Sequence, residues 1–422
     1  MNPRPGRISG RSAAPRLAAV LAFAALAGGC SKPTQPIVIP PISKVVLTPV
    51  TDTLQVGQGA VFTATAYDTS LVAVSVPITW STSNPAVATV NVSGHVLAQG
   101  EGTALLMAAV GGKSDTSTVA VFPDTGWIAQ TSNALEDLHG VFFQPDGRTG
   151  WIAGAAGLVL TTYDAGLTWT RQLPTTFSLN AVWFMDDLNG CVVGNSGTVL
   201  ITDDGGLNWE RSDSTFSSEN LYGVTFAHSD SLIGWAVGQN GVVLRTLDRG
   251  HSWTKQFVVA GQSLRGVSFA GTRDGWAAGD NGVIAGTHDR GLTWFVVQPS
   301  VTIQSLRAVW RANELRAVAV GAAGVAPRTW MPPADSISWM LDNAGAQFQL
   351  NGVSFGDSVV YAAGANGGVG AVLRSDDFGV TWTPQTPRSQ YPLNAAFFVD
   401  RQRGWVVGNN GTIRHTARGG GK

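Results

Sequence analysis

The sequence predicts an all-β protein, in which a small β-sandwich is followed by a seven-bladed β-propeller that its own N-terminal strand closes. The 422 residues include 52 Gly and 15 Trp but only 13% charged residues. This balance is too aromatic for a disordered chain and too poor in charge for long polar helices. From residue 44 onward, short apolar runs alternate with turn residues, as in antiparallel sheets. A strand pattern that starts with Leu then recurs seven times, at intervals of 41 to 44 residues.

Residues 1–29 have the features of a lipoprotein signal peptide. An arginine-bearing start without acids leads into an apolar run, 17–27, and small residues precede Cys30. Residues 26–30 resemble a bacterial lipobox, with the usual Leu one place early, which implies that Cys30 is acylated and anchors the chain to a membrane. Ser31 resembles the sorting pattern of outer-membrane lipoproteins, so we expect an exported protein that is lipid-anchored to the cell envelope. The alternative is an ordinary signal peptide followed by an incidental cysteine.

The charge of the mature chain sets one class of partner aside. Removal of the leader takes away four arginines, so the net charge of −1 becomes −5. A nucleic-acid-binding protein is expected to carry a basic excess that neutralises phosphates. We therefore expect no nucleic acid among the partners.

Residues 30–42 form a proline-rich linker, and residues 43–123 form a small β domain. Four prolines favour an extended, poorly packed tether in the linker. In the domain, the run WSTSNPAVATV from Trp80 and the spaced glycines of residues 94–102 resemble a group 2 bacterial Ig-like domain. The resemblance implies a spacer or adhesive module of exported proteins, with Trp80 packed in its core. We interpret the domain as a spacer because a larger domain follows it.

Residues 124–422 contain repeats of four strands each, the pattern of a propeller blade. Each repeat opens with an apolar strand led by Leu and continues with a second strand, on which an aromatic residue recurs in five repeats. A Gly-x-x-Gly turn then leads into a third strand. Cys191 stands where most repeats have Trp on the second strand, so we expect it to pack in the core. The seven leading leucines are Leu138, Leu179, Leu221, Leu264, Leu306, Leu350 and Leu393.

An Asp box, (Ser/Thr)-x-Asp-x-Gly-x-(Thr/Ser/Asn)-Trp, follows the third strand in five repeats. Two carboxylates that act on one glycosidic bond must lie within about 10 Å of each other, whereas these aspartates are a blade apart. An Asp that caps its own turn needs no substrate, so we expect structural aspartates and no enzymatic activity. No spacing of His, Cys or Glu suits a metal, and no phosphate loop stands out, so we expect no metal and no cofactor. The five aspartates are Asp164, Asp204, Asp248, Asp289 and Asp377.

Two repeats depart from the pattern. The fifth keeps Trp339 but lacks the glycine of its Asp box and contains two consecutive prolines. The seventh stops after its third strand, residues 413–416, and residues 126–130 resemble the missing fourth strand. We expect this N-terminal strand to complete the last blade and close the ring, because closure removes an exposed sheet edge.

The combination of Leu-x-Gly-Val-x-Phe, Gly-Trp-x-x-Gly and an Asp box resembles the photosystem II assembly and stability factor-like propellers over residues 126–416. The Asp box itself resembles the bacterial neuraminidase repeat. The first resemblance implies a non-catalytic propeller that docks a protein on one face. Since one fold hosts many roles, it does not identify the partner. We expect envelope proteins as partners, and a role in the assembly or stability of envelope complexes.

The residue after each leading Leu is polar or amphipathic within an otherwise apolar strand. Equivalent positions of all blades lie near the propeller axis, so we expect these residues to ring one mouth of the central channel and to bind a partner. Arg311, Arg316 and Arg328 of the fifth repeat are expected to extend this ring into a basic patch. The seven ring residues are His139, Asn180, Tyr222, Arg265, Arg307, Asn351 and Asn394.

Three alternatives stay open. In the first, the ring residues only satisfy backbone groups and water in the channel. In the second, the propeller binds or hydrolyses glycans, with Tyr222 and Trp330 as exposed aromatic platforms. In the third, the chain is a purely structural surface protein in which only the Ig-like domain matters.

Overall fold

The computed structural model describes residues 40–122, 125–213, 218–227, 230–258, 261–313, 315–330 and 338–420, with only the backbone for Phe257 and Trp330. The expected lipidation site, Cys30, lies outside these residues. Within the described ranges, no helix has both the length and the apolar character needed to cross a membrane.

Three small sheets surround one apolar core in the N-terminal part of the chain. Leu47, Phe62, Leu106 and Val119 are fully buried in this core, and Trp80 packs against it while partly exposed. The first sheet contains β1 (Ile42–Thr48), β4 (Thr63–Asp68) and β5 (Ala73–Val74). The second contains β2 (Thr51–Gln55), β10 (Lys113–Phe122), β9 (Gly102–Val110) and β6 (Thr79–Thr82), and the third β3 (Gly59–Val61), β8 (His95–Ala98) and β7 (Ala88–Val90).

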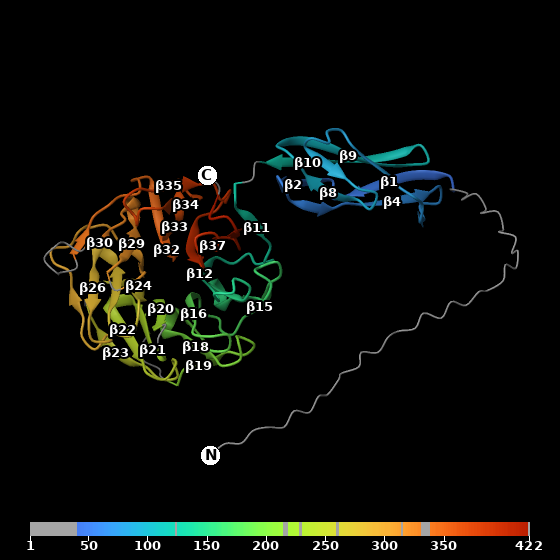
Figure 1. The fold of residues 1–422 in the computed structure, drawn as a ribbon. Helices are drawn as coiled ribbons and strands as arrows, with labels where there is room; N and C mark the ends of the chain where they lie inside the picture. The colour runs from blue at the N-terminus through green and yellow to red at the C-terminus, as the bar shows by residue number, and fades with distance from the viewer. Residues whose placement is uncertain are drawn as a thin grey trace, which may run out of the picture.

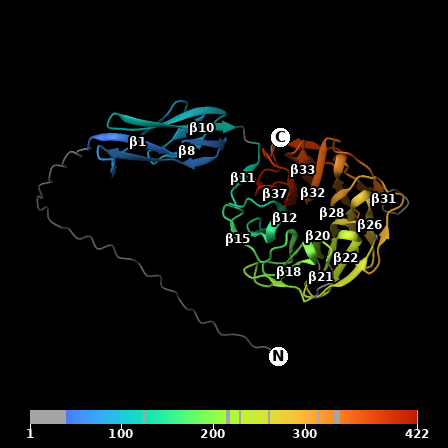
Figure 2. The same ribbon diagram turned by 180° about the vertical axis from the view of Figure 1, so that it is seen from behind.

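The described residues after these strands form seven four-stranded antiparallel sheets, which Figures 1 and 2 show arranged around a common centre. This architecture confirms the prediction of an all-β propeller. We number the sheets as blades 1 to 7 in the order of their innermost strands. Those strands are β12 (Leu138–Phe143), β16 (Leu179–Phe184), β20 (Leu221–Ala227), β24 (Leu264–Phe269), β28 (Leu306–Arg311), β32 (Phe348–Gly356) and β36 (Leu393–Phe398).

The outer strands follow the innermost one in order in blades 1 to 6. Blades 1 and 2 add β13 (Gly150–Gly154), β14 (Val159–Thr162), β15 (Thr170–Gln172), β17 (Gly190–Gly194), β18 (Val199–Thr202) and β19 (Glu210–Arg211). Blades 3 and 4 add β21 (Asp230–Gly238), β22 (Val242–Thr246), β23 (Thr254–Phe257), β25 (Gly275–Gly279), β26 (Ile284–Thr287) and β27 (Phe295–Val296). Blades 5 and 6 add β29 (Ala317–Gly321), β30 (Arg328–Trp330), β31 (Ser338–Met340), β33 (Val359–Asn366), β34 (Val369–Ser375) and β35 (Thr383–Gln385).

In four blades, an aromatic ring on the second strand packs on the first strand of the next blade. In four blade pairs this ring is stacked on a Phe, with centroids 3.4–3.6 Å apart. The same ring donates a hydrogen bond to a backbone carbonyl that follows the third strand of the next blade. One side chain therefore fixes its neighbour by both an apolar and a polar contact. The stacked pairs are Trp151–Phe184, Trp235–Phe269, Tyr361–Phe398 and Trp405–Phe143.

Cys191 occupies the position of this aromatic ring in blade 2. Its side chain is fully buried and belongs to an apolar cluster with Leu221 and Phe226 of blade 3. Burial raises the pKa of the Cys191 thiol strongly, which disfavours the reactive thiolate. The cysteine therefore packs between blades, as the repeat predicts.

Blade 7 contains strands from both ends of the propeller. The strands β36, β37 (Gly404–Gly408) and β38 (Ile413–Thr416) pair in order, and β11 (Ile128–Gln130) pairs antiparallel with β38. In Figure 1 the teal β11 lies beside the red strands of this blade. The backbone N–H of Gly420 donates to Thr416 Oγ1 at 2.9 Å, just as Gly250 N–H donates to Thr246 Oγ1 at 3.0 Å in a complete Asp box.

Trp127 supplies the tryptophan of this last hairpin from the other end of the propeller. The side chain is fully buried, and a Cβ atom added to Gly420 would lie 2.9 Å from its Nε1. Gly420 also has a φ of +77°, so the position needs a glycine on two grounds. Residues from both ends of the propeller therefore build one Asp-box-like hairpin, with Arg418 in the place of the aspartate.

We predict that acid destabilises the propeller through His415 of β38. The ring stacks on Trp405 at 4.6 Å, and burial, aided by the charge of Arg403, lowers the pKa of His415 from 6.5 to about 4. The unfolded chain therefore binds this proton first, so stability is complete above pH 6.5 and falls by about 3 kcal/mol by pH 4. His415→Phe keeps the stack and should remove this loss in urea unfolding at pH 7 and pH 4. An equal loss in both proteins would contradict the assignment.

Candidate functional site

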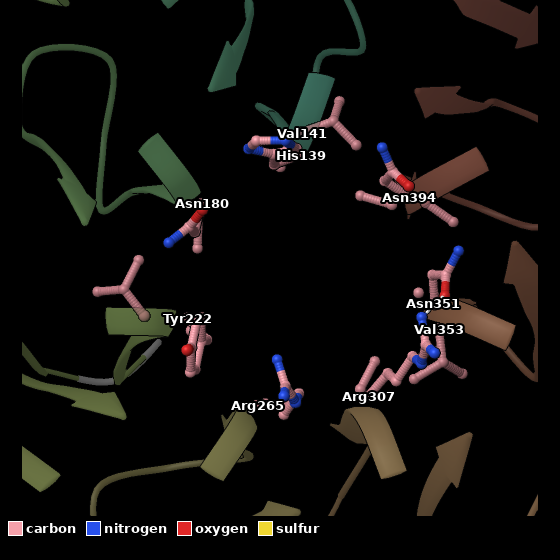
Figure 3. Close-up of a pocket in the computed structure, with 18 of the residues that line it drawn as sticks. His139, Val141, Asn180, Tyr222, Arg265, Arg307, Asn351, Val353 and Asn394 are labelled. Atoms are coloured by element: carbon pink, nitrogen blue, oxygen red, sulfur yellow. Dashed lines mark hydrogen bonds between the residues drawn. The ribbon is translucent and has the colours of Figure 1, made fainter. Parts of the chain in front are cut away.

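All seven ring residues line one pocket at one mouth of the channel. Figure 3 shows their side chains arranged around an open centre. Above them lies a space of about 370 Å³, bordered by His139, Arg265, Asp280, Ser305, Arg307, Asn351 and Asn394. The structure therefore brings together the residues that the repeat pattern aligned.

An irregularity in strand pairing directs each ring side chain toward the axis. In blade 1, Leu138 lies opposite Gly154 and Gly140 lies opposite Ala153, so His139 is an extra residue between them. The pairing of the first two strands shifts at the same position in all seven blades. A β-bulge of this kind turns one side chain out of the regular alternation. The buried leucine and the polar ring residue can therefore be neighbours in the sequence.

Four ring side chains bond the next blade. Each forms a hydrogen bond with the carbonyl oxygen of the leading Leu of the following blade, at 2.7–2.9 Å. These bonds satisfy backbone acceptors where the bulges interrupt regular pairing. We call this set the amide belt, and it consists of His139 to Leu179, Asn180 to Leu221, Asn351 to Leu393 and Asn394 to Leu138. These four side chains thus bond backbone groups, as the first alternative expects.

The other three ring residues, Tyr222, Arg265 and Arg307, lie on adjacent blades and make different contacts. The Arg265 guanidinium lies over the Tyr222 ring, 4.9 Å from its centroid. Arg265 Nε and Nη2 donate to the two carboxylate oxygens of Asp280 at 2.8 and 3.0 Å. Arg307 Nη1 donates to Asn351 Oδ1 at 2.8 Å. We call Tyr222, Arg265 and Arg307 the cationic arc.

The two arginines of the cationic arc differ in charge compensation. Hydrogen bonds to Asp280 raise the pKa of Arg265, and this pair is partly exposed. Across the part of the chain that the structure describes, no carboxylate forms an ion pair with Arg307, and its side chain is exposed. The arc therefore presents one uncompensated guanidinium beside an amide and an aromatic ring, a combination suited to an acidic or carbonyl-rich ligand.

The expected extension of the patch by three more arginines is wrong. Arg311 is only 4% exposed and donates to the Asn313 carbonyl, because its place in β28 points into the blade. Arg328 is largely buried in an ion pair with Asp342. Arg316 is exposed but lies over the Phe378 ring at 5.0 Å, beside an Asp box and therefore on the opposite face.

Each of the five box aspartates bonds its own hairpin. In blade 3, Asp248 Oδ1 accepts from Thr246 Oγ1 at 2.7 Å and from the backbone N–H of Ser252 at 2.9 Å. Hydrogen bonds from Thr293 lower the pKa of Asp289 to about 2. The same contacts recur for Asp164, Asp204 and Asp377, so these carboxylates serve the turns.

Two further polar residues of the mouth escaped the sequence analysis. Asp280 is the first variable residue of a Gly-x-x-Gly turn, and Asn195 and Asn409 occupy the same position in blades 2 and 7. Their side-chain oxygens accept from the ring residue of their own blade, as Asp280 does from Arg265. A polar residue at that position was the signal that could have found Asp280. Ser305 precedes the leading Leu of blade 5, a position that is polar in six of the seven repeats. Among the described residues, no group of three His, Cys, Asp or Glu could hold a metal ion.

Comparison with known structures places the chain among β-propellers. YCF48 bound to a D1 peptide is similar with a TM-score of 0.56 and 21% identity, covering 69% of this chain and 95% of that chain. YCF48 from Cyanidioschyzon merolae has a TM-score of 0.56, 23% identity and coverages of 69% and 98%. A catalytically inactive virginiamycin B lyase from Staphylococcus aureus with quinupristin has a TM-score of 0.57 at only 12% identity, with coverages of 69% and 98%.

A family model narrows this class. The model of the photosynthesis system II assembly factor YCF48 matches residues 170–357. Within the propeller, residues 170–357 are therefore similar to the photosystem II assembly factor family. A search of curated proteins finds no significant match.

We predict that substitutions in the amide belt destabilise the protein more than substitutions in the cationic arc. Asn394→Ala removes bonds to Leu138 and Asn409 and should lower the free energy of unfolding by about 2 kcal/mol. Arg307→Ala removes an exposed side chain and should change the free energy by less than about 0.5 kcal/mol. Thermal and urea unfolding measure both. Equal destabilisation by the two substitutions would contradict the division of the ring.

Proposed function

We propose that this chain is an exported lipoprotein whose propeller is a non-catalytic protein-interaction scaffold, an assembly or stability factor for complexes of the cell envelope. The observation that carries the proposal is the cationic arc. In an otherwise self-bonded ring, it leaves the Arg307 guanidinium exposed, with no carboxylate of the described residues paired to it, under an open space of about 370 Å³. A partner polypeptide that brings a carboxylate or a carbonyl to this space completes the hydrogen bonding of the arc.

The similarity to assembly-factor propellers supports a protein partner. One propeller of similar fold holds a D1 peptide, and the matched family is an assembly factor. The five box aspartates bond their own hairpins, so they lend no support to a catalytic site. The described residues contain no metal cluster that would support one.

The rest of the chain would place this scaffold at the envelope. We propose that Cys30 carries the lipid anchor, that residues 30–42 are the tether and that residues 43–123 are a group 2 bacterial Ig-like spacer. We also propose that the pairing of β11 with β38 closes the propeller of residues 124–422. The membrane anchor keeps the mouth near membrane-bound partners.

We predict that partner recovery depends on the cationic arc. Intact cells are crosslinked, the protein is captured through a C-terminal tag, and the recovered proteins are compared for wild type and Arg265→Ala/Arg307→Ala. A discrete envelope protein should be recovered with the wild type and fall at least about ten-fold with the double variant, because hot-spot arginines contribute about 1.4 kcal/mol or more.

The matched control is Arg316→Ala/Arg401→Ala, which removes two exposed arginines away from the arc. This variant should retain the partner. Loss of the partner in both double variants, recovery of glycans only, or recovery that neither variant changes would contradict the proposal.

A further inference from the structure

The channel is closed toward its opposite mouth by four aromatic side chains. Phe142, Trp183, Trp310 and Phe397 contact one another in a closed cycle. The centroid distances around the cycle are 5.1, 6.4, 5.9 and 4.8 Å, and the ring planes are inclined to one another by 42–67°. We call this group the aromatic floor.

The aromatic floor is a departure from the symmetry of the repeat. Its members all stand four residues after the leading Leu, on blades 1, 2, 5 and 7. Blades 3, 4 and 6 have Thr225, Ser268 and Ser354 there, all nearly fully buried. The hydroxyl oxygens of the two serines accept hydrogen bonds from the backbone of the next blade, at 2.9 and 3.0 Å. The two serines at these positions therefore bond the next blade, whereas the large rings fill the space at the axis.

On the Asp-box side of the aromatic floor lies a cavity of about 240 Å³, which we call the cup. It opens where the innermost strands end, on the side of the Asp boxes. Its walls come from residues that follow or end these strands, namely Gln144, Pro145, Met185, Ala227 and Val399. Sites for drug-sized molecules measure about 300–1,000 Å³, so this cup suits a single apolar ring system.

Gln144 is the polar side chain in the wall that can orient a bound molecule. Gln144 is only 7% exposed, and its Nε2 donates to the Asp186 carbonyl at 2.6 Å. The backbone of Gln144 is held by the turn, through bonds with Thr149 and Gly147. With the amide nitrogen engaged, the Oε1 atom is the acceptor that this side chain can offer to a guest.

We propose that this cup binds an aromatic ring that carries one hydrogen-bond donor, an indole or a phenol. The inclined rings of the aromatic floor favour edge-to-face and offset contacts with a further ring. Gln144 Oε1 accepts the N–H or O–H of that ring. The guest is either a free aromatic molecule or a Trp or Tyr side chain of a peptide, since both present the same chemistry. This site lies at the mouth opposite the cationic arc and does not rest on the proposed function.

The test uses 5-fluoroindole and the full-length protein. Fluorine NMR line broadening should show saturable binding with one molecule per chain. Met185→Trp and Val399→Trp each add a large side chain to a wall of the cup and should weaken the affinity at least ten-fold. Leu188→Trp is the matched control, because Leu188 is exposed and does not line the cup. Arg265→Ala/Arg307→Ala should also bind normally, which keeps this site distinct from the arc.

Competition experiments distinguish a free aromatic molecule from a peptide side chain as the guest. Displacement of 5-fluoroindole by both indole and N-acetyltryptophanamide would assign the cup to a peptide-borne ring, and displacement by indole alone would assign it to a free molecule. The absence of saturable binding to the wild type would overturn the proposal. Unchanged binding in whichever of the two filling variants fold would also overturn it.

Discussion

The contact on which much of the propeller depends is the aromatic ring that, in four of its seven blade pairs, joins the second strand of one blade to the next blade. Trp405, for example, stacks on Phe143 and donates to the carbonyl of Ala165 in the following Asp box. A stack alone would allow sliding, and a hydrogen bond alone would allow rotation. Together they fix where the next blade lies and explain why the Asp-box hairpin must hold its shape. Asp164, Asp204 and Asp289 thus act on the fold through the turns that present these carbonyls.

Once the blades are fixed in this way, the bulge after each leading Leu delivers one polar side chain to the axis. Asn180, Asn351, Asn394 and His139 use that position to bond the next blade. The position can serve recognition only where a blade gives up that bond. Blades 3 to 5 lack that bond, and their ring residues form the cationic arc. The other ring residues of the mouth bond the neighbouring blade. In the proposed function, recognition therefore depends on the three blades that depart from the symmetry of the ring.

The sequence predicted the propeller well because each repeat carries the same apolar and turn signals, and these signals are enough to align the seven ring positions. It could not show which ring residues were engaged, because the partner of Asn394 is a backbone carbonyl 256 residues away. Arg311 was misplaced because strand alternation, not proximity in sequence, decides that it points into the blade. Phe142 and Trp183 looked like ordinary strand hydrophobics, and only the assembled ring shows that they meet at the axis.

The central claim is that the mouth with the cationic arc is the recognition face. Hydrogen–deuterium exchange of the protein with and without its captured partner tests this claim directly, because it reports the bound face without altering the protein. If this mouth binds the partner, peptides that begin β24 and β28 and the turn at Asp280 are protected from exchange. Protection confined to the Asp-box hairpins or to residues 42–122 would contradict the claim.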